Sequence, residues 1–493
     1  MRLWRALYWP IQCVIVMVVI YRKRSIVPMS IWIPALDGKG ALYRAISDAI
    51  AQAVQAGELS PGQRLPPQRR LAEQLGVTVG TVTRAYAEAE RQGWVAGRMG
   101  SGTYVCNSDA KEPPSFLAAP TDSEDGLIDL SLSLPPPHPL RATELGRILS
   151  EISCDETILR RAVEYHPERS VHLYRARFAD WMARLGMPVE AEALVMTQGG
   201  QHGIDLALRA LTRPGERIVA DSLTYPGLIG AARQAHLKTM GVPLEPDGMD
   251  IDALRRLCTQ QPPRLVYVTP DQNNPTGIAL SEEKRKQLAE LANRHEFWII
   301  EDGVQYLPQA DCGTPIYKLA PDRTLFIFST AKVLAGGLRV GALVVPKAMH
   351  ERLSAAVRAQ NWMVPPLMVE AVCRWVEGEE ADKLISWQTL EQSVRQGMAR
   401  ERLSKYFPTG CSHGNNLWLP LPDGVRASAL TATLEQRNVR ITGAEPFCVG
   451  SEPAPQAVRL SLGAASSRKV LAKALDIIHD TLQEPRSLTW RPL

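Results

Sequence analysis

Residues 324–345 of this 493-residue chain read Thr-Leu-Phe-Ile-Phe-Ser-Thr-Ala-Lys-Val-Leu-Ala-Gly-Gly-Leu-Arg-Val-Gly-Ala-Leu-Val-Val. Two short apolar runs, 324–328 and 341–345, stand on either side of a Gly-containing connection. Continuous apolar runs of this length are typical of strands that are buried on both faces. The stretch therefore predicts two core strands, with Lys332 just past the end of the first.

More strands and helices alternate on the N-terminal side of this stretch. Apolar runs at 264–269 and 297–300 predict two further buried strands, and the pattern over 281–294 predicts a helix with Ser281 as its N-cap. Such alternation is typical of an α/β fold with a mostly parallel central sheet. The last part of the chain, 351–493, is helical at first and then mixed, which predicts a smaller C-terminal α+β part.

The residues around Lys332 also suggest chemistry. A lysine just past a buried strand suits a Schiff base with an aldehyde cofactor, and Ser329 and Arg339 nearby suit a phosphate dianion. A lone lysine, however, is far more often a solvated surface residue. The interpretation therefore depends on whether other parts of the chain carry matching signals.

Four earlier clusters supply such signals, each weak or moderate by itself. The Gly turn at 197–203 opens a helix whose free backbone N–H groups can hold a phosphate. Tyr225 can stack on a planar ring or simply pack in a turn. Asn274, in Asn-Pro-Thr-Gly, can donate to a phenolate oxygen. Asp302 ends a buried run at the place where open α/β sheets hold ligands, and a carboxylate there can keep a pyridinium nitrogen protonated.

The five clusters, taken in this order, make residues 127–490 similar to the fold type I aminotransferases. The resemblance implies pyridoxal 5′-phosphate (PLP) as the cofactor, with Lys332 and Asp302 as the catalytic pair. It also implies that Asn274 binds the cofactor's O3′ and that Tyr225 stacks on its ring. The implied phosphate ligands are Gly200, Gln201, Ser329 and Arg339, together with Tyr165, which resembles the tyrosine that reaches the phosphate in the partner subunit. Arg459 resembles the arginine that binds a substrate carboxylate, with a surface salt bridge as the alternative.

Two departures from that family stand out. Ala331 replaces a second serine of many members, which removes one hydroxyl from the phosphate site. Members usually place a tyrosine two or three residues after the aspartate, where it supports O3′. Here those positions hold Val304 and Gln305, and Tyr306 follows one residue later. Tyr306 substitutes only if the loop bulges.

Residues 36–105 predict a separate helical unit. The apolar face of the first helix, 41–56, is formed by Leu42, Ile46, Ala49, Ile50 and Ala53. Pro67 suits the first turn of a second helix that ends at Gly76, and Thr78 caps a third that runs to Gly93. Residues 94–105 then predict a two-stranded wing. This is the helix-turn-helix pattern, although a three-helix protein-interaction domain fits the spacing equally well.

The stretch 42–105 resembles the winged helix-turn-helix of GntR-type regulators, most closely over Arg64–Val77. The resemblance implies binding to double-stranded operator DNA. Many GntR members carry base-reading arginines where this chain has Val79 and Thr83, so those contacts do not transfer. The residues that we expect at the DNA are Arg64, Arg69, Thr78, Thr81 and Arg84.

A GntR-like reader, a linker and an aminotransferase-like domain together resemble the MocR family of bacterial regulators. The resemblance implies a cytoplasmic, nucleoid-associated homodimer that uses PLP to sense a small amino compound or PLP itself. Such sensing requires the ligand to bind two arrangements of the protein with different affinity. Two alternatives stay open: an aminotransferase of amino acid and 2-oxo acid pairs with an appended DNA-binding domain, and a membrane-tethered sensor. Residual transamination is compatible with the first prediction.

Composition excludes several other classes of protein. Hydrophobic residues make up 45% and charged residues 22%, which is ordinary globular composition and excludes global disorder. The eight cysteines form no CxxC pair and none sits beside spaced histidines, so we expect neither a disulfide scaffold nor a metal site. The net charge of +4 is too small to argue for nucleic-acid binding by itself.

Residues 1–28 differ from the rest of the chain. They hold five basic residues and no acidic one, so residues 29–493 carry +4 − 5 = −1. The apolar stretch 7–21 is shorter than the roughly 20 residues of a spanning helix, so we expect no association with a membrane. We expect Met29 to be the natural start. The predicted organisation is thus a leader 1–28, a DNA-binding domain 36–105, a linker 106–126 and a PLP-binding domain 127–490.

Overall fold

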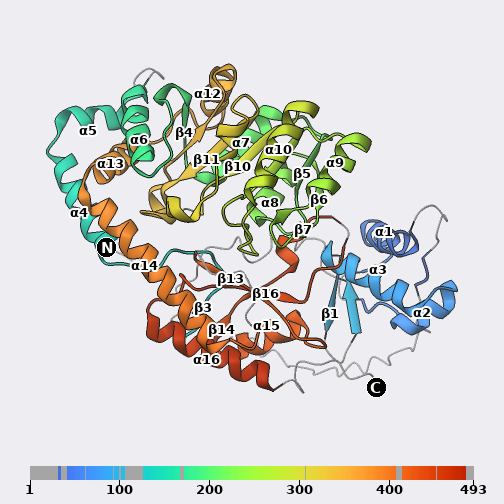
Figure 1. Ribbon diagram of the computed structural model, residues 1–493. Coiled ribbons are helices and arrows are strands. Elements are labelled where there is room, and N and C mark those ends of the chain that lie inside the picture. Colours follow the sequence, from blue (N-terminus) through green and yellow to red (C-terminus); the bar gives the residue numbers. More distant parts are fainter. Residues whose placement is uncertain are drawn as a thin grey trace, which may run out of the picture. The chain divides into compact units, whose positions relative to one another are not determined.

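In the computed structural model the chain divides into two units, residues 1–111 and 112–493 (Figure 1). The structure describes residues 32–34, 41–60, 63–92, 94–98, 102–105, 126–166, 171–305, 307–406, 414–450 and 452–484. The predicted leader 1–28 and the expected start at Met29 lie outside the described residues. The same holds for nearly all of the predicted linker and for Tyr306.

The described residues of the first unit form three helices and a two-stranded antiparallel ribbon. These are α1 (Leu42–Gln55), α2 (Gln68–Leu75), α3 (Val79–Arg91), β1 (Val95–Arg98) and β2 (Gly102–Val105). Ile46, Ile50 and Ala53 of α1 enter the core as predicted, whereas Leu42 is 47% exposed and Tyr43 is buried in its place. Ala49 is only half-buried, and Ser47 and Val54 are buried as well, so the buried stripe is shifted toward the side of Tyr43, Ser47 and Val54. Helix α2 ends at Gly76, whose φ of +66° suits glycine.

The second unit is built on a seven-stranded sheet with the strand order β4-β12-β11-β10-β9-β5-β6. Only β12 runs antiparallel to its neighbours, β4 and β11; the other pairs are parallel. The strands are β4 (Leu194–Thr197), β5 (Arg217–Asp221), β6 (Lys238–Val242), β9 (Leu265–Val268), β10 (Trp298–Asp302), β11 (Thr324–Ser329) and β12 (Gly341–Val344). All four strands predicted from apolar runs are present within one or two residues of their expected bounds.

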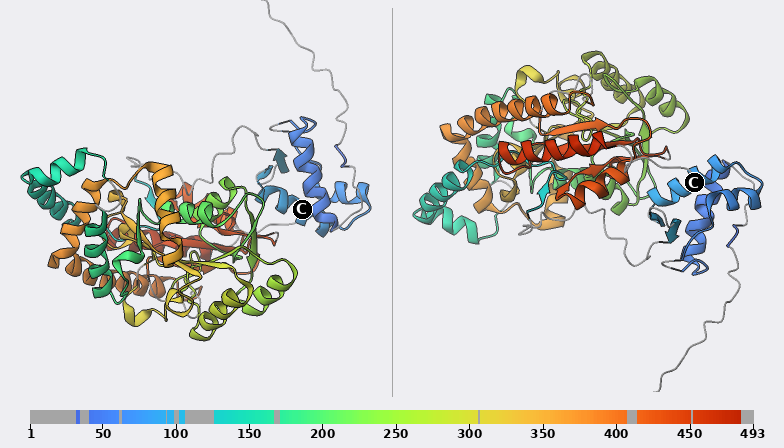
Figure 2. Two further views of the ribbon diagram at one scale, coloured as in Figure 1. Left: turned by 90° about the horizontal axis from the view of Figure 1, so that it is seen from above. Right: turned by 90° about the horizontal axis from the view of Figure 1, so that it is seen from below.

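Helices cover both faces of this sheet, as Figure 2 shows. Alternate strand residues such as Leu325 and Ile327 pack against α7 (Gly200–Leu211), α8 (Pro226–Gln234) and α12 (Lys347–Asn361). The intervening residues, such as Phe326 and Phe328, face the other side. The helices on that side are α6 (His172–Arg184), α9 (Ile251–Gln260), α10 (Glu282–His295), α11 (Ile316–Leu319) and α13 (Pro366–Glu377). Burial on both faces explains why the strand sequences are continuously apolar.

Helix α10 begins after Ser281, which was predicted as its N-cap. Ser281 occupies that position, but its hydroxyl bonds the carboxylate of Asp247 at 3.1 Å and caps no backbone N–H. The remaining elements of this region are α4 (Leu140–Ser153), α5 (Glu156–Val163), β7 (Leu244–Glu245), β8 (Gly248–Met249) and the short 3-10 helices η4 (Ala191–Ala193), η5 (Gln309–Asp311), η6 (Thr330–Lys332) and η7 (Gly336–Leu338).

A smaller C-terminal part has its own core. The antiparallel strands β13 (Asn416–Pro420), β16 (Ala457–Ser461) and β15 (Thr442–Gly443) pair in the order β13-β16-β15. Against them and beside one another lie α14 (Glu379–Arg402), α15 (Ala427–Gln436) and α16 (Arg468–Gln483), with η8 (Glu445–Phe447). A short parallel pair, β3 (Ile128–Asp129) with β14 (Val439–Arg440), attaches the start of the unit to this part. The α+β expectation for the C-terminal part is therefore confirmed.

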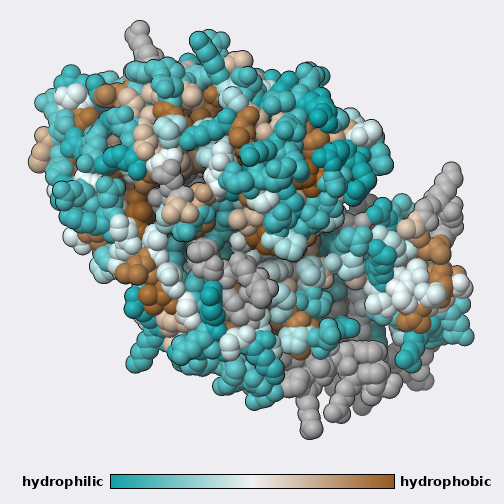
Figure 3. Space-filling view, in the orientation of Figure 1, coloured by the Kyte–Doolittle hydropathy of each residue, from teal (hydrophilic) through white to brown (hydrophobic). Residues whose placement is uncertain are grey.

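Across the described ranges, no helix is both long enough and apolar enough to span a bilayer. On the face drawn in Figure 3, hydrophobic residues are scattered among hydrophilic ones.

Candidate functional site

A cavity of about 150 Å³ lies at the carboxyl ends of the central strands. Eight of the predicted cofactor residues line it: Gly200, Gln201, Tyr225, Asn274, Asp302, Ser329, Lys332 and Arg339. The other lining residues are Ser133, Ile204, Tyr267, Thr269, Val304, Gln305 and Ala331. Residues that are 139 positions apart in the sequence thus share one site.

The sheet topology explains this convergence. Strands β9, β10 and β11 run parallel, so the residues that follow them meet at one edge. Strand β12 runs antiparallel to β11, so it begins at the edge where β11 ends. Lys332, which follows β11, and Arg339, which precedes β12, therefore both reach the same cavity.

Lys332 is held by one hydrogen bond at its amine and one at its backbone carbonyl. Its Nζ donates to the carbonyl of Ser133, and its own carbonyl accepts from Nε2 of Gln388 at 2.7 Å. Burial lowers the pKa of Lys332 to about 8, and the positive charges of Arg459 and Arg339 act in the same direction. A lysine amine with a lowered pKa is more often neutral near physiological pH, which is the nucleophilic form.

Asp302 ends β10 and is 8% exposed. Its Oδ2 accepts a hydrogen bond from the hydroxyl of Tyr267 at 2.5 Å, and its Oδ1 accepts from the backbone N–H of Val304 at 2.9 Å. Burial raises the pKa of this carboxyl, while the two hydrogen bonds and Lys332 oppose the rise. The carboxylate is thus oriented by one donor on each oxygen.

The start of helix α7 lies directly against Arg339 in the wall of the cavity. Gly199 has a φ of +81°, and a Cβ at this position would lie 2.7 Å from a guanidinium nitrogen of Arg339. A Cβ at Gly200 would lie 2.5 Å from a methyl group of Val304. Only glycine therefore allows the guanidinium and the first N–H groups of α7 to come this close. Arg339 itself adopts a left-handed φ of +52° and donates to the carbonyl of Gln198 at 3.2 Å.

Ser329 and Tyr225 complete this part of the cavity. The Ser329 hydroxyl accepts from the N–H of Ala331 at 3.2 Å, and Ala331 adds no hydroxyl of its own. Tyr225 precedes α8, and burial raises the pKa of its phenol to about 12. Gln201 donates to the carbonyl of Gly227 at 3.0 Å, which ties α7 to α8.

Arg459 lies on β16, outside the lining of the cavity but bonded to it. Its Nη1 donates to Oδ1 of Asn274 at 2.9 Å, and its Nη2 donates to the carbonyl of Ser131. The guanidinium is 4.8 Å from the ring centre of Phe447, and the residue is 4% exposed. Burial lowers its pKa to about 10. A surface salt bridge, the alternative for this arginine, is wrong because the side chain is buried, and it bonds no carboxylate among the described residues.

Several buried polar atoms around the cavity have no hydrogen-bond partner among the described residues. They are Oγ1 of Thr269, Oε1 of Gln305 and Nε of Arg459. A buried polar atom without a partner costs roughly 1–3 kcal/mol, so a site with several is suited to a polar ligand. Together with an amine, a carboxylate and a guanidinium, this donor and acceptor set fits the aldehyde, pyridine and phosphate groups of PLP.

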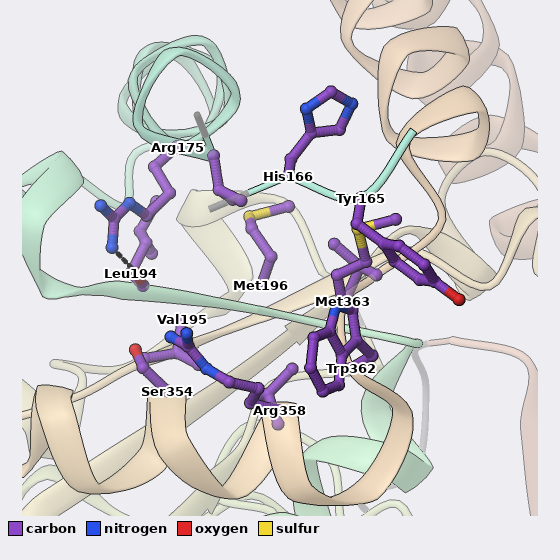
Figure 4. A pocket seen from close by; sticks show the side chains of 13 residues that line it. Tyr165, His166, Arg175, Leu194, Val195, Met196, Ser354, Arg358, Trp362 and Met363 are labelled. Atoms are coloured by element: carbon purple, nitrogen blue, oxygen red, sulfur yellow. Dashed lines mark hydrogen bonds between the residues drawn. The ribbon is translucent and has the colours of Figure 1, made fainter. Parts of the chain in front are cut away.

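Tyr165 lies elsewhere. It is 80% exposed and lines a second cavity of about 240 Å³ between α12 and the segment that precedes α6 (Figure 4). Its ring meets the exposed Trp362 edge-on, with 5.7 Å between the ring centres. Within its own chain Tyr165 therefore does not line the 150 Å³ cavity, and its role toward a partner subunit stays a prediction.

The structure adds residues that the motifs did not indicate. Tyr267 is in a run predicted only as a core strand, yet it bonds Asp302. Ser133 lies 199 residues before Lys332, and its hydroxyl accepts from Nε2 of Gln305 at 3.1 Å. A tyrosine in an otherwise aliphatic strand beside the Asp302 strand was the one available signal. The positions where a tyrosine would support O3′ hold Val304 and Gln305, both at the cavity.

In the first unit, the predicted DNA-contacting residues lie around α2, α3 and the wing. Thr78 caps α3 by accepting the N–H of Thr81 at 3.2 Å, and the two hydroxyls are 2.9 Å apart. Arg64 and Arg69 are exposed, and the backbone of Arg64 forms an isolated antiparallel β-bridge with Tyr104 of the wing. The guanidinium of Arg84 lies 4.1 Å from the ring centre of Tyr43.

Comparison with known proteins agrees with both units. Residues 157–478 match the family described as aminotransferase class I and II, and residues 42–105 match the bacterial regulatory proteins of the gntR family. Over 471 residues the chain is 28% identical to the uncharacterized HTH-type transcriptional regulator YdeF of Bacillus subtilis strain 168, covering 93% of this chain and 98% of that protein. It is 27% identical to the vitamin B6 salvage pathway transcriptional repressor PtsJ of Salmonella typhimurium strain LT2, covering 90% and 98%.

Solved structures agree on the fold of the second unit. The multiple substrate aminotransferase of Thermococcus profundus superposes with a TM-score of 0.65 at 23% identity, covering 77% of this chain and 95% of that one. At this identity the likeness establishes the fold alone.

Proposed function

The chain belongs to the aminotransferase class I and II family and carries a gntR-type domain, which together make it a transcriptional regulator of the MocR type; we propose that it binds PLP in the 150 Å³ cavity and reads an amino compound there. The single observation that carries this proposal is the convergence of Lys332, Asp302 and Arg339 on one cavity whose walls keep buried polar atoms unpaired. The PtsJ relative, named for vitamin B6 salvage, supports recognition of a B6 compound.

Each of the cavity residues would bind a different part of the cofactor. When bound, PLP supplies an aldehyde that condenses with amino groups and a ring that withdraws electrons. Lys332 would hold the aldehyde carbon, and Asp302 the proton on the ring nitrogen. Asn274 would bind O3′, and Tyr225 would cover the ring. Gly200, Gln201, Ser329 and Arg339 would bind the phosphate at the start of α7, where backbone N–H groups favour an anion.

Arg459 gives the effector a second point of attachment. Its guanidinium is already desolvated and oriented by Ser131 and Asn274, so a carboxylate that reaches it gains a charge-assisted hydrogen bond without ordering the arginine. An amino acid would thus be held at its amino group by the cofactor and at its carboxylate by Arg459. An amine without a carboxylate would lose the second attachment.

An aminotransferase with an appended DNA-binding domain is the second candidate. The observation that favours it is that Lys332, Asp302 and Asn274 all line one cavity, and that Arg459 is bonded to Asn274 at its edge. Steady-state turnover with amino acid and 2-oxo acid pairs separates the two functions. Rapid turnover without any binding of operator DNA would support the enzyme and contradict the regulator.

We include a homodimer in the proposal. At the cavity of Figure 4 two large aromatic side chains are exposed, Tyr165 at 80% and Trp362 at 59%, and Val163, two residues before Tyr165 in the chain, is 84% exposed. Apolar groups this exposed are typical of a surface that a partner covers. A second copy of the chain bound here would bury these side chains. Its Tyr165 would then be available to reach the cofactor phosphate of the first copy.

The test of the proposed function is a visible absorption spectrum of the purified full-length protein with PLP added, recorded beside that of Lys332→Ala. We expect an absorption band in the wild type that the variant lacks. DNA binding is measured in parallel, by selection from random duplexes. A wild type that gains no band refutes the cofactor proposal, and one that enriches no duplex refutes the DNA proposal.

A further inference from the structure

The exposed face of the first two turns of α3 holds no arginine before Arg84. Val79 is 43% exposed, and Gly80 and Thr83 beside it are also exposed. This face is the one that would enter the major groove, so the inference that follows rests on the proposed DNA-binding function. The question is which chemical group of DNA such a face can recognise.

The threonine hydroxyls of this region are largely occupied within the protein. The Thr83 hydroxyl donates to Oε1 of Gln68 at 2.7 Å, close also to the carbonyl of Val79 at 3.0 Å. Thr78 and Thr81 share one hydroxyl hydrogen between them over 2.9 Å. Of three hydroxyl hydrogens, one is left for DNA. Val79 and Thr83 are exposed, so their methyl groups are available for apolar contact with a base.

Neither arginine of α3 projects from its first turn. Arg84 is held over the ring of Tyr43 on α1, and Arg91, in the last turn, is bonded to Glu88 at 2.9 Å. Guanine is read in the major groove by two donors that reach O6 and N7 together, usually from arginine. The side chain of Val79 has no donor, so it cannot select guanine in this way.

Thymine is the base that an apolar side chain can distinguish, because its 5-methyl group lies in the major groove. We propose that Val79 reads the 5-methyl group of a thymine in the operator, with the methyl group of Thr83 beside it. The helix would then select an A·T pair where an arginine at the same position selects guanine. The exposed Arg64 and Arg69 would supply affinity for the phosphates without selecting this base pair.

The experiment uses the full-length protein and duplexes selected from a random library. In the best duplex each thymine is replaced, one at a time, by uracil, which differs only by the missing methyl group. Kd is measured for the wild type, Val79→Ala and Arg69→Ala. Losing one buried methyl contact weakens binding about fourfold. We expect at least one uracil to weaken the wild type by about this factor, and the same uracil to have no effect on Val79→Ala.

Arg69→Ala is the control. It should weaken thymine and uracil duplexes equally, because a phosphate contact does not sense the methyl group. Val79→Arg should shift the preferred base from thymine to guanine. The inference is overturned if wild type binds every uracil duplex as tightly as the thymine duplex, or if Val79→Ala keeps the same sensitivity. If no duplex is enriched at all, the proposed DNA-binding function fails, which is a different outcome.

Discussion

The hydroxyl of Tyr267 donates a hydrogen bond of 2.5 Å to Oδ2 of Asp302, and both side chains are buried. Without this donor, one carboxylate oxygen in a buried site would lose its partner. The bond therefore favours the ionised form of Asp302 against the burial that raises its pKa.

Tyr267→Phe should consequently weaken PLP binding and reduce protonation of the ring nitrogen. A lost hydrogen bond to a charged group is worth about 1.5–3 kcal/mol, or at least tenfold in Kd. The measurement is PLP affinity together with the 15N chemical shift of labelled PLP. Tyr317→Phe is the matched control, because the Tyr317 hydroxyl is buried and has no hydrogen-bond partner in the part of the chain that the structure describes. Equal effects of the two variants would contradict the role of Tyr267.

Capture of PLP by the apo-protein should depend on pH around the pKa of Lys332. This pKa is lowered to about 8, so the amine is protonated below that pH and neutral above it. The rate at which the visible band appears should rise about tenfold from one pH unit below this value to one unit above. Lys332→Ala should give no band at any pH.

Arg459→Gln should move that pH midpoint upward. Arg459 is one of the positive charges that lower the pKa of Lys332, so its removal stabilises the ammonium form and raises that pKa. The same variant should bind amino acids about 10- to 100-fold more weakly while binding the matching amines nearly as before. Spectral titration measures both effects. Arg437→Gln, which changes a partly exposed arginine paired with Glu484, should do neither.

Trp362→Arg should shift the protein from dimers to monomers in sedimentation experiments. The substitution places a charge beside the exposed ring of Tyr165. Leu390→Arg changes a residue that is equally exposed, at 63%, but lies on α14. A dimer that survives the first change, or is lost with the second, would contradict the proposed interface.

Thr78→Ala should lower the free energy of unfolding of the first unit by about 1 kcal/mol, because α3 loses its only side-chain cap. Thr78→Ser keeps the hydroxyl and should keep most of the stability. Thermal unfolding of the two variants gives the comparison. Equal stabilities would mean that the cap contributes nothing.

The sequence was sufficient for most of the cavity because its residues stand in short motifs at strand ends. Asn274, Asp302 and Lys332 each follow or end an apolar run, and parallel strands bring such ends together. Tyr267 was not predictable in this way, since its contact depends on the register of β9 against β10, where Tyr267 stands beside Ile300. Ser133 belongs to no motif and meets Lys332 only through the tertiary fold.

In the helical unit, too, the contacts that depend on tertiary packing could not be predicted from the sequence pattern. Periodicity located α1 but not its rotation, and the buried residue proved to be Tyr43 rather than Leu42. Tyr43 is buried where Arg84 of α3 lies over its ring. That contact is between two helices, so no pattern within α1 alone contains it.

The reversed direction of β12 also makes a reporter possible. Both ends of the connection 330–340 are fixed in one sheet. Movement of the middle of this connection can therefore be measured relative to the sheet. Gly337 lies there, exposed, with nothing within 4 Å of where a side chain would begin. A fluorescent or spin-labelled side chain at 337 would thus sense events at Lys332 and Arg339 from outside the cavity, and would time the arrival of an effector in the intact regulator.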